Sequence, residues 1–190
     1  MAEPQLRRMT QDEFFAWQQN QDELYELVDG LPVPRWKMMT GASRAHDRVV
    51  VNIIASLHAK LRGSGCQPTT DDLAVRLPSG NVRRPDVTVE CGQGERTDVA
   101  VTEPRVIIEV LSPSTMNFDR IRKLPEYQTI STVSHILIVD TEAPRVDLWS
   151  RGQAGWTQAK FDGLAAVVEL PAIRASLSLA DVFEGLEFDP

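Results

Sequence analysis

A short apolar segment with one charge inside it constrains the fold of this chain more than any other feature. Residues 106–111 read VIIEVL, which has the length and composition of a buried strand. Glu109 lies inside that segment. An ionised carboxylate is costly to bury unless something compensates its charge. The sequence therefore predicts that Glu109 has a cationic partner or a functional role.

Strand-like and helix-like patterns alternate along all 190 residues. A capping box at Thr10 and Glu13 predicts a helix after residue 10. A cap at Ser43 and apolar residues at helical spacing predict a second helix up to about residue 62, and a third is expected within 120–130. Alternating or continuous apolar runs predict strands over 24–30, 31–39, 69–77, 82–91, 105–111 and 133–140. The pattern is typical of a mixed β-sheet flanked by helices, in the α/β or α+β class.

The C-terminal part and the chain length complete this fold prediction. Four further short antiparallel strands are expected at 145–151, 156–161, 165–170 and 175–179. A chain of 190 residues favours one domain, so residues 1–190 are predicted to form a single unit, with residues 1–8 poorly ordered.

Charge and cysteine content limit the class of protein. A net charge of −7 argues against a protein that coats nucleic acid indiscriminately, although it leaves room for a local basic cleft. Cys66 and Cys91 have no CxxC spacing, which predicts neither a disulfide framework nor a zinc site. No apolar stretch approaches the ~20 residues of a membrane span, and no signal peptide is recognisable. We therefore expect a reduced, cytoplasmic protein without membrane contact.

A second acid, Asp86, follows Pro85 at the start of another predicted strand. If this strand neighbours that of Glu109, at about 4.8 Å, the two carboxylates converge on one point. Mg²⁺ or Mn²⁺ suits such oxygen ligands, activates a bound water and neutralises charge on a phosphoryl group. Lys123, in the following helix, could return over the strand ends and orient that water or stabilise the phosphate.

Ion pairing is the alternative interpretation of the two acids. Arg83, Arg84 or Arg105 could pair with Asp86 and Glu109, because buried ion pairs of this kind occur without any catalytic role. Spacing alone does not decide between a metal site and a set of ion pairs.

The order of motifs resembles a known family. Pro85-Asp86, then IIEVLSPST, FDRIRK, Tyr127 and ILIVD are similar to the Uma-type restriction endonucleases, a branch of the PD-(D/E)XK nuclease superfamily. The resemblance covers roughly residues 9–187. It implies a restriction-endonuclease-like sheet, Mg²⁺ dependence and hydrolysis of DNA phosphodiester bonds. Under it, Asp86 and Glu109 match the metal-binding acids.

Two features depart from the superfamily pattern. The usual lysine position, two residues after the glutamate, is Leu111 here, whereas Lys123 matches a lysine that the Uma-type branch carries in the next helix. Pro125 is unusual inside a helix, so this helix either begins near Arg122 or is kinked. If the chain is catalytic, Lys123 is the expected third catalytic residue beside Asp86 and Glu109.

Other residues are candidates for lining this site. Three of them have an alternative role: a salt bridge to Arg35 or Lys37 for Glu26, helix capping or packing for His46, and core packing for Tyr127. The site-lining candidates are Glu26, His46, Asp119 and Tyr127, and the phosphate-binding candidates are Arg84, Arg120 and Arg122. The expected partner is DNA, and a homodimer would match the two-fold symmetry of a duplex. The alternative function is a non-catalytic module of the same fold that binds nucleic acid or a protein.

Overall fold

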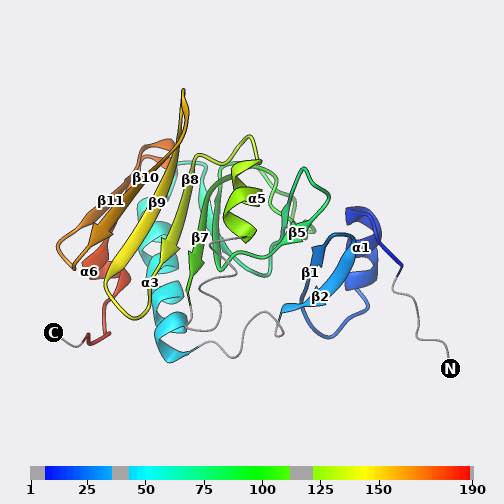
Figure 1. Ribbon diagram of the computed structural model, residues 1–190, viewed down its shortest axis with the longest axis horizontal. Coiled ribbons are helices and arrows are strands. Elements are labelled where there is room, and N and C mark those ends of the chain that lie inside the picture. The colour runs from blue at the N-terminus through cyan, green and yellow to red at the C-terminus, as the bar shows by residue number, and fades with distance from the viewer. Residues whose placement is uncertain (1–6, 36–42, 112–121, 189–190) are drawn as a thin grey trace.

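The computed structural model describes residues 7–35, 43–111 and 122–188 (Figure 1). Its central element is a six-stranded sheet with the strand order β10-β9-β8-β7-β6-β3. Only the β7–β8 pair is parallel among its five strand pairs, and the others are antiparallel. The predicted mixed sheet is therefore confirmed. The strands are β3 (Gln67–Thr70), β6 (Val87–Glu90), β7 (Pro104–Val110), β8 (His135–Val139), β9 (Arg145–Gly152) and β10 (Gly155–Asp162).

A second sheet forms the N-terminal part and has the order β2-β1-β5-β4. Thr10 and Glu13 form the predicted capping box at the start of its helix. The β1–β2 hairpin turns at Asp29-Gly30, where both residues have positive φ, and β2 is an edge strand, as its prolines predict. The elements are α1 (Gln11–Gln18), β1 (Tyr25–Val28), β2 (Leu31–Pro34), β4 (Val75–Arg76) and β5 (Val82–Arg83).

The C-terminal part adds the predicted antiparallel strands. β9 and β10 form a hairpin at one edge of the central sheet, and β11 and β12 form a separate two-stranded sheet. In Figure 1 these strands lie at the opposite end of the molecule from α1 and the β1–β2 hairpin. The remaining elements are β11 (Val167–Leu170), the 3₁₀ turn η2 (Pro171–Ile173), β12 (Ala175–Ser178) and α6 (Leu179–Val182).

Two helices pack against opposite faces of the central sheet. α3 (Arg44–Lys60) begins after the predicted cap, Ser43, and buries its apolar stripe in a cluster with Val87, Val106 and Ile108. α5 (Leu124–Gln128) instead contributes Tyr127 to a cluster with Ile107 and Ile136. Because side chains alternate along a strand, Val106 and Ile107 point to opposite faces. In the described ranges, no helix is long and apolar enough to cross a membrane.

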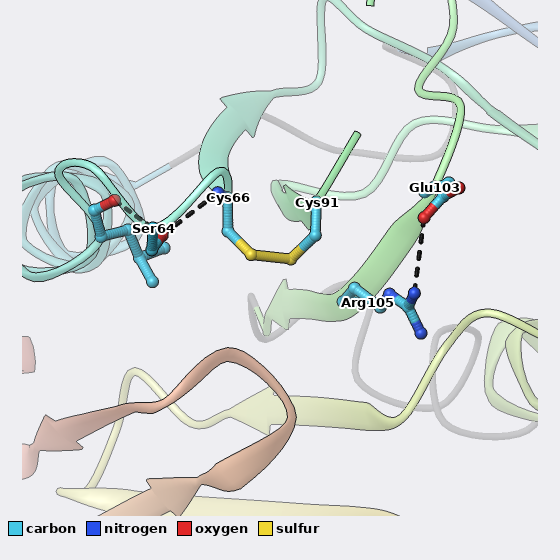
Figure 2. Close-up of a disulfide and its surroundings, with 6 residues drawn as sticks. Ser64, Cys66, Cys91, Glu103 and Arg105 are labelled. Carbon is cyan, nitrogen blue, oxygen red and sulfur yellow. Dashed lines mark hydrogen bonds and ion pairs between the residues drawn. A yellow bond between two sulfur atoms is a disulfide. The ribbon is translucent and has the colours of Figure 1, made fainter. Parts of the chain in front are cut away.

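The predicted absence of a disulfide is wrong. Cys66 directly precedes β3 and Cys91 directly follows β6, and these strands pair with Gln67 opposite Glu90. The two cysteines therefore face each other, with a Cα–Cα distance of 4.0 Å, and form a disulfide (Figure 2). They are 25 residues apart, so only the strand register brings them together. The cytoplasmic location stays an expectation.

Candidate functional site

The strands that carry the two acids are neighbours, so the condition stated for a shared site is met. β6 and β7 pair antiparallel with Val87 opposite Ile108, which puts Asp86 and Glu109 at the next step of the same ladder. The side chain of Asp86 also contacts β7 directly, because its Oδ2 accepts a hydrogen bond of 2.8 Å from the backbone N–H of Val110. Both acids are buried, with 6% and 2% of their surface exposed. The metal-binding and catalytic roles of the two acids stay predictions.

Asp86 is surrounded by cationic and hydrogen-bonding groups. Arg35 Nη2 lies 3.0 Å from its Oδ1, and His46 Nε2 lies 3.4 Å from its Oδ2. Arg35 also pairs with Asp71, which follows β3. Burial raises the pKa of Asp86, but His46, the Val110 N–H and Lys123 outweigh it, so the net pKa is lowered. Asp86 is therefore held as a carboxylate.

Glu109 accepts two side-chain contacts on the same oxygen. Lys123 Nζ lies 3.2 Å from Glu109 Oε1, and the Tyr127 hydroxyl donates to that oxygen at 2.5 Å. Burial, together with the nearby charges of Glu109 and Glu26, raises the pKa of Tyr127 well above its usual value. The phenol therefore stays protonated and acts as a donor. These contacts answer the question that the buried glutamate poses: it has a cationic partner.

Lys123 lies between two glutamates from different sheets. Its Nζ is 3.2 Å from Glu109 Oε1 and 3.6 Å from Glu26 Oε1. Burial raises the pKa of Glu26, but Lys123, Arg83 and the Arg84 N–H outweigh that effect, so the net pKa is lowered. Glu26, a site-lining candidate, therefore lies beside Lys123. Its ion-pair partners are Arg83 and Lys123, not the expected Arg35 or Lys37.

The helix that follows Lys123 explains the unusual proline. α5 begins at Leu124, so Pro125 lies in its first turn, where its missing N–H breaks no helical hydrogen bond. The helix therefore begins close to Arg122, one of the two possibilities left open by the sequence. Lys123 and Tyr127 are four residues apart, share one face of this segment and reach Glu109 together.

The predicted ion-pair partners differ from those observed. Arg83 pairs with Glu26 and Glu126, and Arg105 pairs with Glu103. Arg35, expected beside Glu26, pairs with Asp86 instead. Strand register and helix placement, which the sequence does not specify, determine these pairs.

The predicted phosphate-binding arginines fall in different places. Arg84 is buried and donates to the backbone carbonyls of Tyr25, Asp71 and Asp72, which is a structural role. Arg122 is exposed beside the site. Asp119, Arg120 and Lys37 lie outside the described residues.

Two residues of the site were missed by sequence reasoning. Arg35 follows an edge strand and carries no motif that links it to Asp86. Glu126 had a usable signal, because it comes three residues after Lys123 and so lies on an adjacent part of the same helical surface. Its partner, Arg83, is 43 residues away in the sequence.

Asp86 and Glu109 are the two candidate ligands for a hard divalent cation. Mg²⁺ is commonly held by one or two carboxylates and keeps several of its waters. Within the described parts of the chain, no group of three or more His, Cys, Asp or Glu side chains could hold a metal. An ion held by Asp86 and Glu109 would have to share their oxygens with the cations and donors already in contact with them, and would complete its shell with oxygens of water or substrate.

Comparison with known proteins identifies the family of this chain. A model of the Uma2 family, described as "Putative restriction endonuclease", matches residues 11–182. An uncharacterized protein of Synechocystis sp., slr1290, is 27% identical over 184 residues, which cover 95% of this chain and 94% of the relative. A second, sll1609, is 28% identical over 171 residues, covering 87% and 94%. The chain therefore belongs to the Uma2 family of restriction-endonuclease-like proteins.

Proposed function

We propose that this protein is an endonuclease that hydrolyses DNA phosphodiester bonds with Mg²⁺ or Mn²⁺ held by Asp86 and Glu109. The observation that carries the proposal is the contact of 3.2 Å between Lys123 Nζ and Glu109 Oε1. Lys123 supplies a cation beside the carboxylates, although the position at which the superfamily usually carries its lysine is Leu111 here. Family membership supports a nuclease, and the pairing of β6 with β7 supports a shared ion.

Each residue has a distinct part in this proposal. When bound, the ion supplies a water of lowered pKa and neutralises charge on the phosphoryl group. Lys123 stabilises the negative charge that develops on the phosphate during bond cleavage. Tyr127 and Glu26 hold Glu109 and Lys123 in place through the contacts at 2.5 Å and 3.6 Å. The exposed Arg122 is suited to contact a neighbouring phosphate.

A second candidate function is a non-catalytic module that binds nucleic acid. One observation favours it: Asp86 is already compensated by Arg35, His46 and the Val110 N–H, so it does not require a metal ion. In this alternative, ion pairs replace the metal and the fold presents a binding surface. The two candidates differ in whether divalent ions bind and whether DNA is cut.

A cleavage assay separates the two candidates. Plasmid, single-stranded DNA and RNA are incubated with the protein in Mg²⁺, Mn²⁺ or EDTA, beside Asp86→Ala and Lys123→Met. We expect metal-dependent cleavage by the wild type, and a turnover loss of roughly 100-fold with nearly unchanged DNA affinity in Lys123→Met. Asp162→Asn, which breaks the exposed pair with Arg145, is the matched control and should retain activity.

Two results would contradict the proposal. Metal-independent DNA binding without cleavage by the wild type would favour the non-catalytic module. Full activity in Lys123→Met would remove that lysine from the mechanism. A further readout is the melting temperature, because an ion that binds only the folded state raises it. Glu109→Gln should lose most of that rise if Glu109 is a ligand.

A further inference from the structure

The helix that carries Tyr127 and adjoins Lys123 is too short to set its own position. α5 has 5 residues, and Lys123, the residue at its N-terminal boundary, makes no side-chain cap. Isolated helices below about 12 residues are marginal in water. The placement of the Lys123 ammonium must therefore come from contacts between α5 and the rest of the protein.

Glu126 provides the most specific of these contacts. Its Oε2 accepts from Arg83 Nε at 2.7 Å, and its Oε1 accepts from Arg83 Nη2 at 2.9 Å. Asn81 Nδ2 adds a third donor, 2.9 Å from the same Oε1. A two-point pair between a guanidinium and a carboxylate defines orientation as well as distance. The pair therefore restricts both rotation and translation of α5 against the N-terminal sheet.

Arg83 also reaches Lys123 indirectly, through Glu26. Its Nη1 donates to Glu26 Oε2 at 2.9 Å, and Glu26 Oε1 lies 3.6 Å from Lys123 Nζ. Burial lowers the pKa of Arg83, but Glu126 and Glu26 more than offset this, so the guanidinium stays charged. A closed ring results, from α5 through Arg83 and Glu26 back to Lys123.

We propose that Arg83 and Glu126 are positioning residues that hold the Lys123 ammonium between Glu26 and Glu109. Arg83 is 1% exposed, so it acts through the ring and not on substrate. The catalytic consequence of this inference rests on the proposed nuclease function, but the placement of Lys123 does not. Displacement of a catalytic group by about 1 Å can reduce a rate by roughly 100-fold.

The test variant is Glu126→Gln, because Glu126 is 23% exposed and the substitution keeps its size. It removes the charge and one of the acceptors that Arg83 uses. Lys123 reactivity is measured by brief acetylation with acetic anhydride and peptide mass spectrometry, with the exposed Lys160 as the internal reference. We expect the labelling of Lys123 relative to Lys160 to rise roughly fivefold or more, since a loosened segment opens more often.

Two controls separate positioning from general loosening. Asp162→Asn breaks an exposed arginine–carboxylate pair of 2.6 Å elsewhere, and Val168→Ala removes apolar packing in β11, remote from the ring. Neither should change the relative labelling of Lys123. A second variant, Asn81→Asp, keeps an acceptor for the Asp29 N–H but places a negative charge beside Glu126, and it should act in the same direction as Glu126→Gln.

Cleavage kinetics then connect placement to turnover. Glu126→Gln should lower kcat roughly tenfold or more with KM within about twofold, because the lysine acts on the transition state. Unchanged labelling of Lys123 in Glu126→Gln, or an equal rise in Val168→Ala, would overturn the inference. If the wild type does not cleave DNA, the proposed function fails, and the labelling result alone decides whether the ring positions Lys123.

Discussion

The two faces of the central sheet are stabilised in different ways. The face covered by α3 buries mainly apolar side chains, including Val87, Ile108 and Leu57, beside two buried histidines, His46 and His135. The opposite face combines a smaller apolar cluster around Ile107 and Tyr127 with the buried charges of Glu109, Lys123, Glu26 and Arg83. One face is typical of a core that provides stability, and the other holds charged groups at defined distances.

This difference separates two requirements within a single sheet. Apolar burial is non-directional and tolerates small shifts, so it stabilises the fold without defining any one atom's position. Buried ion pairs depend strongly on geometry, and losing one partner leaves an uncompensated charge. We infer that apolar burial on the α3 face provides most of the stability of the fold. This stability offsets the cost of burying charged groups on the opposite face.

The largest effect is expected from breaking the charged face. Arg83→Met should lower the free energy of unfolding by about 4 kcal/mol, because Glu26 and Glu126 then lose a buried cation. Urea unfolding monitored by circular dichroism measures it. Leu57→Ala is the comparison on the apolar face, with an expected loss of about 3 kcal/mol.

The response to acid distinguishes these two variants. The loss in Arg83→Met should shrink as the pH falls below about 4.5, because protonation then removes the charges left unpaired. The loss in Leu57→Ala should stay the same over that range. Equal pH dependence in both would contradict the division of roles between the faces.

A smaller effect is expected from a change that acts on the sheet itself. Reduction of the Cys66–Cys91 disulfide, or the double change Cys66→Ser and Cys91→Ser, should cost about 3 kcal/mol, since the bond closes a loop over a separation of 25 residues. Thermal melts with and without a reducing agent measure it. The serine variant should be insensitive to the reducing agent. No shift in the wild type on complete reduction, verified by thiol titration, would show that the β3–β6 register alone holds this edge.

The smallest expected effect is on the pH dependence of the free energy of unfolding. The pKa values of Glu26 and Asp86 are lowered from ordinary values of 4.5 and 3.8, so both groups stabilise the fold above those values. That contribution is lost as the pH falls from about 4.5 through the lowered pKa values of the folded state. Glu26→Gln should flatten this part of the profile, measured by urea unfolding at a series of pH values. A slope as steep as that of the wild type would show that other carboxylates dominate acid unfolding.

Local patterns were sufficient to predict most elements and part of the site. The capping box at Thr10, the cap at Ser43 and the strand containing Glu109 all occur as expected, because each depends on residues within a few positions. The pairing of the strands that carry Asp86 and Glu109 was also predicted, although only as a condition. Lys123 was expected over the strand ends from the short connection and the family resemblance, but its ion pair with Glu109 was not predicted.

Partners far apart in the sequence could not be predicted. Arg35 compensates Asp86 over 51 residues, Arg83 reaches Glu126 over 43, and Cys66 meets Cys91 over 25. Nothing local distinguishes these arginines from the others, and nothing local indicates that the two cysteines meet. Such pairs follow from strand register, where a slip of one residue would turn every side chain to the other face.

The sequence by itself determined most of the segments that become strands and helices, and that a carboxylate must be compensated inside a buried strand. The strands expected at 69–77 and 82–91 each divide between the two sheets, which local pattern did not predict. Only the tertiary structure decided which groups compensate it: Lys123 and Tyr127 at Glu109, Arg35 and His46 at Asp86. The physical reason is range. Propensity, capping and apolar periodicity act over a few residues, whereas the energy of a buried charge depends on whatever the whole fold brings within a few ångströms of it.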